Sequence, residues 1–200
     1  MTRRLLAVVL LAGLSLAGCA EDTAAPAGPA ASTTASRSVP DVGDPVDAAE
    51  FLDDPCGLLS AQEATDLGLP FPEKDGLAGR VACAWREDSG DPAPLEVLRV
   101  QILKEYGLAK ISAECKVGCD TWVPADISGY PALHANGPLE SRFGMCRLYV
   151  GITNTRTLMV TDGDLDAMKQ GADRGDAGGP KCDRADRAAR MVVERLRASR

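Results

Sequence analysis

Histidine, aromatic residues and basic charge are all scarce in this chain of 200 residues. A single histidine, His134, excludes a multi-histidine metal site. Aromatic residues make up 4% of the chain, and 22 basic residues stand against 29 acidic ones, which gives a net charge of −7. A nucleic-acid-binding surface needs a basic patch, so we expect no nucleic acid among the partners. The remaining composition, 45% hydrophobic and 26% charged, is ordinary for a globular protein.

Common catalytic and phosphate-binding motifs are also missing. The sequence has no Gly-x-Ser-x-Gly nucleophile elbow, and its glycines at 175–179 lie in an acidic stretch whose charge has the wrong sign for phosphate. Asp126, Ser128 and His134 could form a triad, but they come from one short stretch, whereas triad partners usually come from separate elements. We therefore expect no enzyme activity, no cofactor and no metal site.

The first nineteen residues have the layout of an export signal. Arg3 and Arg4 precede an apolar run over residues 5–16, which is shorter than the about 20 residues of a transmembrane helix. The run ends in Leu16-Ala17-Gly18-Cys19, which resembles the bacterial lipobox. We expect residues 1–18 to be a signal peptide and Cys19 to carry the lipid; the alternative is an ordinary cleaved signal that contains a cysteine.

This N-terminus predicts a location at the cell membrane, lipid-anchored on the extracytoplasmic face. Arg3-Arg4 also allows twin-arginine export, although the uninterrupted apolar core and the cysteines favour the general secretory route. Residues 19–50 are rich in Ala, Pro, Ser, Thr and Gly, and after Cys19 they contain no aromatic residue, Leu, Ile or Met. Such a segment buries too little apolar surface to offset chain entropy, so we expect a disordered tether followed by one domain over residues 51–200.

Six further cysteines follow the lipidation site, and in an oxidising compartment we expect them to form three disulfides. They are Cys56, Cys83, Cys115, Cys119, Cys146 and Cys182. Fifteen pairings are possible, and sequence alone does not choose between them.

The predicted elements favour one of these pairings. Cys56–Cys83 would join the start of the first helix to the next strand, and Cys146–Cys182 would fix the last helix over the core. Cys115–Cys119 then remains by elimination. Within a continuous helix these two side chains would be too far apart for a bridge. Gly118 can end the helix before Cys119, which keeps the local bridge possible.

The hydrophobic pattern predicts an α+β domain, with an antiparallel sheet of about five strands and helices packed on one face. In the second strand, Leu98, Val100 and Ile102 point to one face and Arg99 and Gln101 to the other. Helices are expected over 61–67, 105–115 and 182–198, and strands over 80–87, 95–104, 129–135, 143–153 and 155–161.

Two charged regions allow a second interpretation. Asp162, Asp164, Asp166 and Asp173 fall on positions 1, 3, 5 and 12 of a calcium loop, but Ala167 replaces the required glycine, so we favour a solvated loop. The last helix could face anionic lipid or wall polymer, but a narrow, alanine-rich apolar stripe favours core packing with a solvated face. Its arginines are Arg184, Arg187, Arg190, Arg195, Arg197 and Arg200.

Several short motifs together resemble a family of actinobacterial envelope lipoproteins of unknown function. They are Pro55-Cys56-Gly57-Leu58-Leu59, Cys83-Ala84-Trp85, Gly129-Tyr130-Pro131-Ala132, Cys146-x-Leu148-x-Val150 and the helix opening at Cys182-Asp183. The resemblance covers roughly residues 54–196 and implies a fold like that of the PsbP and Mog1 proteins. It implies no activity, and Cys115 and Cys119 are additions to its pattern.

These observations favour a membrane-anchored, non-enzymatic binding or interaction module whose partner is an unknown protein or envelope ligand. One alternative is a carrier or sensor of a small apolar ligand. An envelope hydrolase is the third, disfavoured by the missing catalytic motifs.

Overall fold

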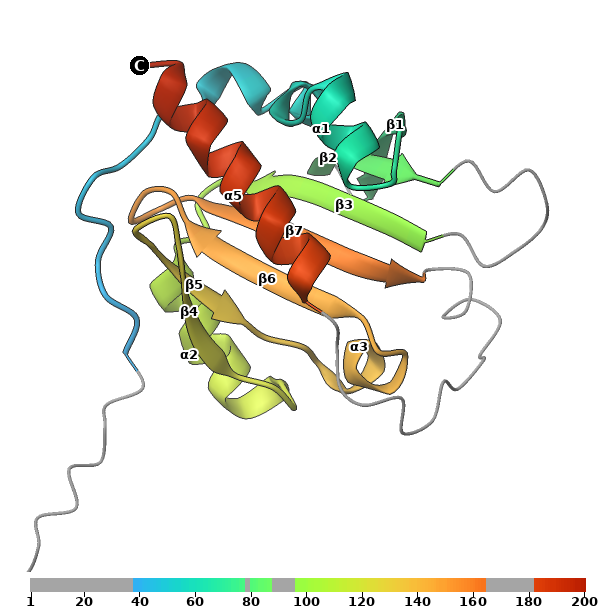
Figure 1. Ribbon diagram of the computed structural model, residues 1–200. Coiled ribbons are helices and arrows are strands. Elements are labelled where there is room, and N and C mark those ends of the chain that lie inside the picture. The colour runs from blue at the N-terminus through green and yellow to red at the C-terminus, as the bar shows by residue number, and fades with distance from the viewer. Residues whose placement is uncertain (1–37, 78–79, 88–95, 165–181) are drawn as a thin grey trace, which may run out of the picture. The chain divides into compact units, whose positions relative to one another are not determined.

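A sheet of seven antiparallel strands, in the order β1-β2-β3-β7-β6-β5-β4, forms the frame of the domain (Figure 1). The computed structural model describes residues 38–77, 80–87, 96–164 and 182–200. The antiparallel sheet agrees with the sequence prediction, but it has seven strands instead of about five. The strands are β1 Phe71–Leu77, β2 Arg80–Arg86, β3 Glu96–Leu103, β4 Val123–Ile127, β5 Tyr130–His134, β6 Cys146–Gly151 and β7 Thr157–Asp164.

Both unpredicted strands lie at the edges of the sheet. β1 contains Pro72, Gly76 and three consecutive charged residues at 73–75, and β4 contains Pro124. Proline and charge are tolerated at an edge, where one side of the strand forms no ladder hydrogen bonds. The same residues remove the alternating pattern by which a strand is recognised in sequence.

Within the described residues, the helices are short except for α5. They are the 3-10 helices η1 Ala49–Phe51 and η2 Pro55–Leu58, and the α-helices α1 Ala61–Asp66, α2 Leu108–Gly118, α3 Pro138–Arg142 and α5 Asp183–Ala198. At the start of α1, the Ser60 hydroxyl accepts a hydrogen bond from the Glu63 N–H, and the Glu63 carboxylate accepts one from the Ser60 N–H. This reciprocal pair is a capping box, which fixes the start of the helix.

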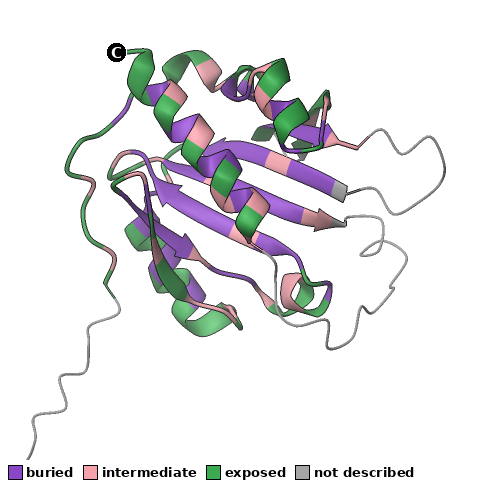
Figure 2. Cartoon of the chain, in the orientation of Figure 1, coloured by how far each residue is buried: buried purple, intermediate pink, exposed green. Residues whose placement is uncertain are grey.

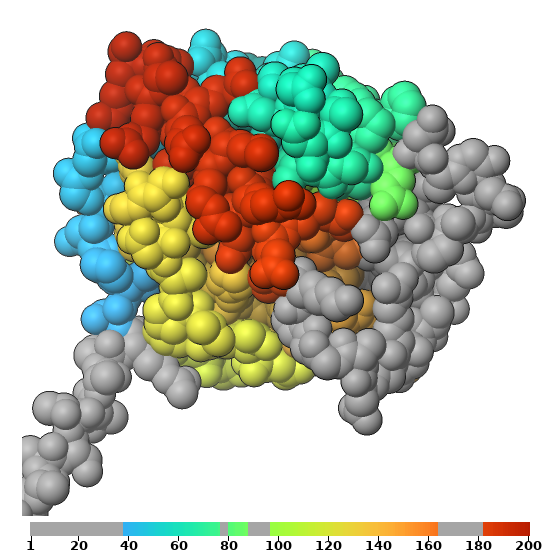
Figure 3. Space-filling model, in the orientation of Figure 1, coloured from blue at the N-terminus to red at the C-terminus, as the bar shows by residue number. Residues whose placement is uncertain are grey.

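Helix α5 covers the first face of the sheet, packing on β6 and β7 (Figures 1 and 3). Its predicted stripe is fully buried, and Figure 2 shows this side of the helix turned toward the strands. The buried residues of the stripe are Ala185, Ala188, Ala189, Val192, Val193 and Leu196. From the strands, Trp85, Leu98 and Leu148 belong to the same core.

Helix α2 lies on the second face, so the prediction of helices on one face only is wrong. Its Leu108, Ile111 and Cys115 pack with Leu133 of β5 and Tyr149 of β6 in a separate small core. A sequence stripe identifies the buried side of a helix but does not say which side of the sheet it meets.

The start of α2 also differs from prediction, at Leu108 instead of residue 105. Glu105 has a φ of 60°, outside the helical region, and Gly107 is the N-cap. A Cβ at Gly107 would clash with the backbone of Asn154, so the chain needs glycine where it enters the helix.

The segment 38–50, in blue in Figure 1, packs along the domain, whereas its composition predicts part of a tether. Val46 is buried, and its N–H donates to the Ile152 carbonyl at 3.0 Å. The Tyr130 hydroxyl donates to the Asp44 carbonyl at 2.8 Å.

The domain therefore begins before residue 51. The predicted signal peptide 1–18, the lipidation site Cys19 and the first part of the tether lie outside the described residues.

Candidate functional site

The second face of the sheet is only partly covered. Helix α2 packs on β5 and β6, and between this helix and the middle of the sheet lies a cavity of about 620 Å³. A volume of about 300–1,000 Å³ is typical of small-molecule sites. We call this cavity the sheet groove; its walls include Arg99, Gln101, Tyr149 and Met159 from the strands and Ile111 and Glu114 from α2.

Strand register places two rows of side chains along the floor of this face. One row runs from Ala82 through Gln101 and Met159 to Tyr149. The next runs from Ala84 through Arg99 and Thr161 to Arg147. Small alanines on β2 and long polar side chains on β3 and β6 thus produce a hollow with a polar floor.

Two arginines of the groove are held by carboxylates. Arg99 Nε lies 3.1 Å from Asp75 of β1, and Arg147 forms an ion pair with Glu140 of α3. Their side chains are 21% and 29% exposed, so part of each guanidinium reaches solvent while most of it is desolvated. The Arg147 Nε is buried and forms no hydrogen bond within the described part of the chain.

Gln101 is the most unusual residue of the groove. Its side chain is 3% exposed, and its amide forms no hydrogen bond with any described residue. It borders both the sheet groove and an adjoining cavity of about 210 Å³. The Gln101 amide atoms are not among the fully buried polar atoms that lack a partner in the described part of the chain, so they are open to these cavities. Gln101 is therefore a polar group to which a ligand or water in these cavities can hydrogen-bond.

Arg80 borders the same two cavities as Gln101. Gln101 pairs with Ala82, two residues beyond Arg80, so Arg80 is a diagonal neighbour within reach of a long side chain. Arg80 forms no ion pair within the described residues; its guanidinium carbon lies 6.0 Å from the centre of the Tyr106 ring.

Two tyrosines add hydroxyl groups. Burial raises the pKa of Tyr149, although the Arg147 guanidinium beside it opposes this shift. Tyr149 is therefore a neutral phenol at physiological pH, able to donate a hydrogen bond. The Tyr106 hydroxyl lies 3.5 Å from a Glu114 carboxylate oxygen.

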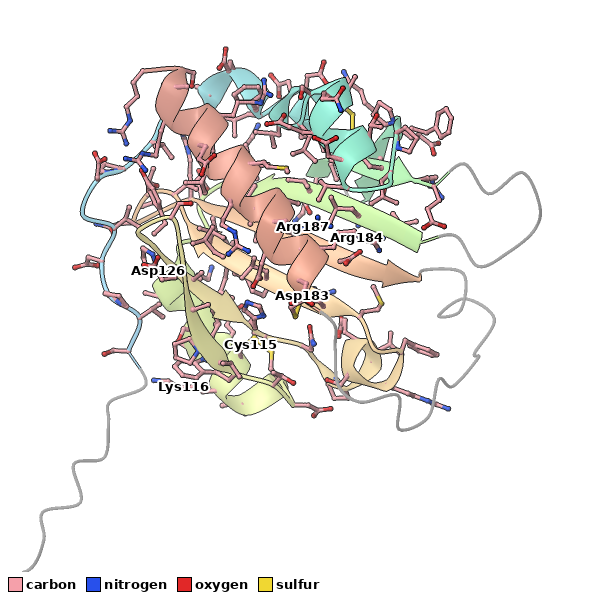
Figure 4. All side chains as sticks on the ribbon, in the orientation of Figure 1. Cys115, Lys116, Asp126, Asp183, Arg184 and Arg187 are labelled. Carbon is pink, nitrogen blue, oxygen red and sulfur yellow. A yellow bond between two sulfur atoms is a disulfide. The ribbon has the colours of Figure 1, made fainter. Side chains whose placement is uncertain are left out.

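The residues considered for a catalytic triad do not come together. Asp126 accepts a hydrogen bond from the Gly129 N–H at 2.9 Å and stabilises the turn between β4 and β5 (Figure 4). Ser128 lies in this turn with a φ of 53°. His134 lies at the far end of β5, opposite Val123.

His134 instead contacts the last helix. Its Nε2 lies 3.1 Å from the Asp186 carboxylate, and its Nδ1 lies 4.0 Å from Cys146 Sγ. These atoms and Cys182 Sγ form a cluster of metal-ligating type. Both sulfurs are bonded to each other, so neither is the thiolate that a metal site requires.

The structure has three disulfides, with the pairs favoured from the sequence: Cys56–Cys83, Cys115–Cys119 and Cys146–Cys182. Their Cα–Cα distances are 5.0, 4.7 and 5.3 Å. Cys119 follows the last residue of α2 and has an extended backbone, which brings it close to Cys115 (labelled in Figure 4). Because the helix ends at Gly118, a disulfide can form between cysteines only four residues apart.

The calcium-loop hypothesis fails at its first position. Asp162 belongs to strand β7, is buried, and accepts hydrogen bonds from Arg184 Nε at 2.9 and 3.1 Å. Asp164 is also in β7, whereas Asp166 and Asp173 lie outside the described residues. A carboxylate bound to a guanidinium is not the ligand that such a loop needs.

The arginines of the last helix divide between its two sides. Arg184, Arg195 and Arg200 form ion pairs with Asp162, Glu63 and Asp44, which tie three other segments to the helix and its end. The remaining ones, Arg187, Arg190 and Arg197, are exposed. This arrangement agrees with core packing and a solvated outer face.

Comparison with known families gives one match. Residues 14–195 match the family described as "Protein of unknown function (DUF3558)". The chain belongs to this family. No curated protein and no solved structure matches the chain.

Membership of DUF3558 agrees with the resemblance in one respect, because the family has no assigned function. The actinobacterial origin, the lipid anchor and the likeness to PsbP and Mog1 stay predictions. Among the described residues, no helix has the length and apolar character needed to cross a membrane.

The sequence placed two residues of the groove on one face of a strand but did not predict a site there. Alternation in β3 assigned Arg99 and Gln101 to a common face. Arg80, Arg147 and Tyr149 reach the same groove from β2 and β6, and only the strand order brings these segments together. A strongly polar face on a central strand is the signal that points to such a site.

Proposed function

We propose that this protein is a lipid-anchored binding module on the extracytoplasmic face of the cell membrane, which holds a small ligand in the sheet groove without transforming it. The observation that carries this proposal is Gln101, which is buried, borders a cavity of ligand size and forms no side-chain hydrogen bond with a described residue. The lipobox-like residues 16–19 support the anchor. A fold of PsbP/Mog1 type belongs to the same proposal.

The absence of an assembled triad at Asp126, Ser128 and His134 supports binding over hydrolysis, the disfavoured alternative. The second candidate, a carrier of an apolar ligand, has support from the groove itself, since Leu103, Ile111 and Met159 contribute apolar walls. Both candidates place the ligand in the same groove.

Gly118 offers a way to block the groove. It borders the cavity, and an added Cβ there meets no atom within 4 Å, so Gly118→Phe adds bulk without moving the backbone. Gly43 has equally open surroundings in segment 38–50 and does not border the groove, which makes Gly43→Phe the matched control.

The test is native mass spectrometry of full-length protein extracted from cell envelopes in mild detergent. We expect a small-molecule adduct on the wild type and on Gly43→Phe, and its loss from Gly118→Phe. An adduct retained by Gly118→Phe, or absent from the wild type, would contradict a ligand site in the groove.

The anchor is tested separately by Cys19→Ala. We expect the wild type to carry a diacylglycerol mass on Cys19 and to remain with membranes after a salt wash. The variant should be released. A wild-type mature chain that begins at another residue and carries no lipid would refute the anchor while leaving the groove proposal intact.

A further inference from the structure

Positive groups outnumber carboxylates around the sheet groove. Among its described lining residues, Glu114 carries the only carboxylate, while Arg80, Arg99 and Arg147 carry guanidinium groups. Lys110 adds a cation near Arg80, with its Nζ 3.8 Å from the centre of the Tyr106 ring. This local excess is notable in a protein whose net charge is −7.

Arg80 and Lys110 differ from the other two cations in having no carboxylate partner within the described residues. Arg99 and Arg147 are already bound to Asp75 and Glu140, so they position the floor of the groove more than they attract charge. Two cations, against the single carboxylate of Glu114, therefore gather at the end of the groove near Tyr106.

Hydrogen-bond donors lie beside this charge. The Gln101 amide has unused N–H groups and is a diagonal neighbour of Arg80 on the same face. Tyr149, kept neutral by burial, adds a hydroxyl farther along the floor. An anion accepts from an amide, a phenol and a guanidinium alike, whereas an ammonium group accepts from none of them.

Apolar side chains lie directly beside these polar groups. Leu103 of β3 borders the adjoining cavity together with Arg80, Met159 of β7 is opposite Gln101, and Ile111 of α2 borders the groove from the helix. Leu103 and Ile111 belong to the small core under α2, which fixes their positions. A ligand near Arg80 and Gln101 thus meets donors, positive charge and hydrocarbon side by side.

We infer that the sheet groove selects a small amphiphilic anion, with a carboxylate or phosphate head near Arg80 and Gln101 and an apolar body against Leu103, Ile111 and Met159. This inference rests on the proposed binding function and specifies its ligand class. The two heads share one chemistry, and the experiment separates them.

Four probes with the same eight-carbon chain test the selection: octanoate, octyl phosphate, octanol and octylammonium. Each is titrated into isotope-labelled full-length protein while NMR follows the Gln101 side-chain amide and the Arg80 Nε–H. We expect octanoate and octyl phosphate to shift both signals and octylammonium to shift neither. The tighter of the two anions identifies the preferred head.

Variants identify which positive charge contributes to anion binding. Arg80→Gln should weaken the binding of both anions about tenfold, as expected for the loss of one charge-assisted hydrogen bond, and leave octanol unchanged. Arg80→Lys should restore part of the affinity. Arg190→Gln removes the same charge from the exposed side of α5, on the opposite face of the sheet, and should change nothing.

Three results would overturn the inference: octanol or octylammonium binding the groove as tightly as octanoate, no shift of the Gln101 signal with either anion, or equal losses in Arg80→Gln and Arg190→Gln. Equal binding of octanol or octylammonium would show that the groove binds ligands without selecting anions, so the proposed function would stand. If neither anion shifts the Gln101 signal, the comparison of Gly118→Phe with the wild type decides separately whether the groove holds a ligand.

Discussion

At the scale of single residues, Gln101 is the residue whose environment indicates a role in binding more than a role in folding. The residue is 3% exposed and borders two cavities, so its amide is placed to bind what fills them. Its position in the middle of β3, where an apolar side chain would fit equally well, points to the contents of the groove.

Gln101→Leu should leave the ligand-free protein about as stable as the wild type, because it removes no hydrogen bond to a described residue and replaces the amide with a side chain of similar volume. The same change should abolish the octanoate-induced shift of Arg80. Urea unfolding and NMR titration measure the two effects. A loss of several kcal/mol would instead show that Gln101 has a structural role, and would remove the main support for the site.

Glu63 gives a prediction for pH. Burial alone raises the pKa of its carboxyl, but hydrogen bonds from the Ser60 N–H and hydroxyl, together with Arg195, outweigh burial and hold the pKa below the ordinary 4.5. As pH falls, the unfolded chain takes up this proton first. The stability that Glu63 contributes is thus complete above about pH 4.5 and is lost as pH falls through the lower, folded-state value.

Glu63→Gln should lower stability at neutral pH and flatten the acid side of the profile, as followed by urea unfolding between neutral and acid pH. Glu194→Gln, which removes an exposed carboxylate from α5 and keeps the contacts of Glu63, is the matched control and should leave the acid slope unchanged. An unchanged acid slope in Glu63→Gln would show that other carboxylates govern acid unfolding.

At the scale of elements, two of the disulfides between described residues fasten a helix to the sheet. Cys146–Cys182 joins β6 to the start of α5, and Cys56–Cys83 joins η2 to β2. Both cross-link elements that are far apart in sequence. Cys115–Cys119 only closes the end of α2 on itself.

Replacing both cysteines of the Cys146–Cys182 disulfide with serine should therefore lower the free energy of unfolding more than replacing both cysteines of Cys115–Cys119. Chain entropy for separations of 36 and 4 residues gives about 4 and about 2 kcal/mol. Urea unfolding of the two double variants measures the difference. Equal losses would mean that the local bridge stabilises α2 through native contacts in addition to loop entropy.

The elements that sequence predicted correctly are those with a clear period and a buried face. The alternation of β6 and the stripe of α5 both encode contact with one core, and both are buried as expected. Edge strands β1 and β4 carry proline and charge because they have fewer neighbours to satisfy, so no period marks them. The side of the sheet on which α2 packs depends on chain path, which no local pattern records.

The sheet groove could not be predicted from the sequence either, because it also depends on the path of the chain. Its polar side chains come from β2, β3 and β6, and the order of strands brings them together. The hollow also requires that α2 covers β5 and β6 and stops short of β3. Only the Arg99–Gln101 alternation was readable in advance, and alone it described an ordinary exposed face.

At the scale of the whole molecule, the domain is longer than its composition indicates. Val46 and Ala48 are too small to stand out in a tether-like sequence, yet both are buried. The segment is also held by Arg200, which donates to the Asp44 carboxylate at 2.8 Å and to the Pro45 carbonyl at 2.9 Å.

A chain beginning at residue 38 should consequently be as stable as the full mature chain, and one beginning at residue 51 less stable by about 2–4 kcal/mol, on the scale of losing a few small buried side chains. Thermal unfolding of the two truncations measures this. Equal unfolding temperatures would show that residues 38–50 do not stabilise the domain and belong to the tether.

The central claim is that the sheet groove holds a ligand, and a crystal structure of full-length protein purified from cell envelopes without a stripping step tests it most directly. We predict density for a small molecule in the groove, with an acceptor atom within hydrogen-bond distance of the Gln101 amide and near the Arg80 guanidinium. A groove that holds only water, or that is filled by another part of the chain bonded to Gln101, would contradict the claim.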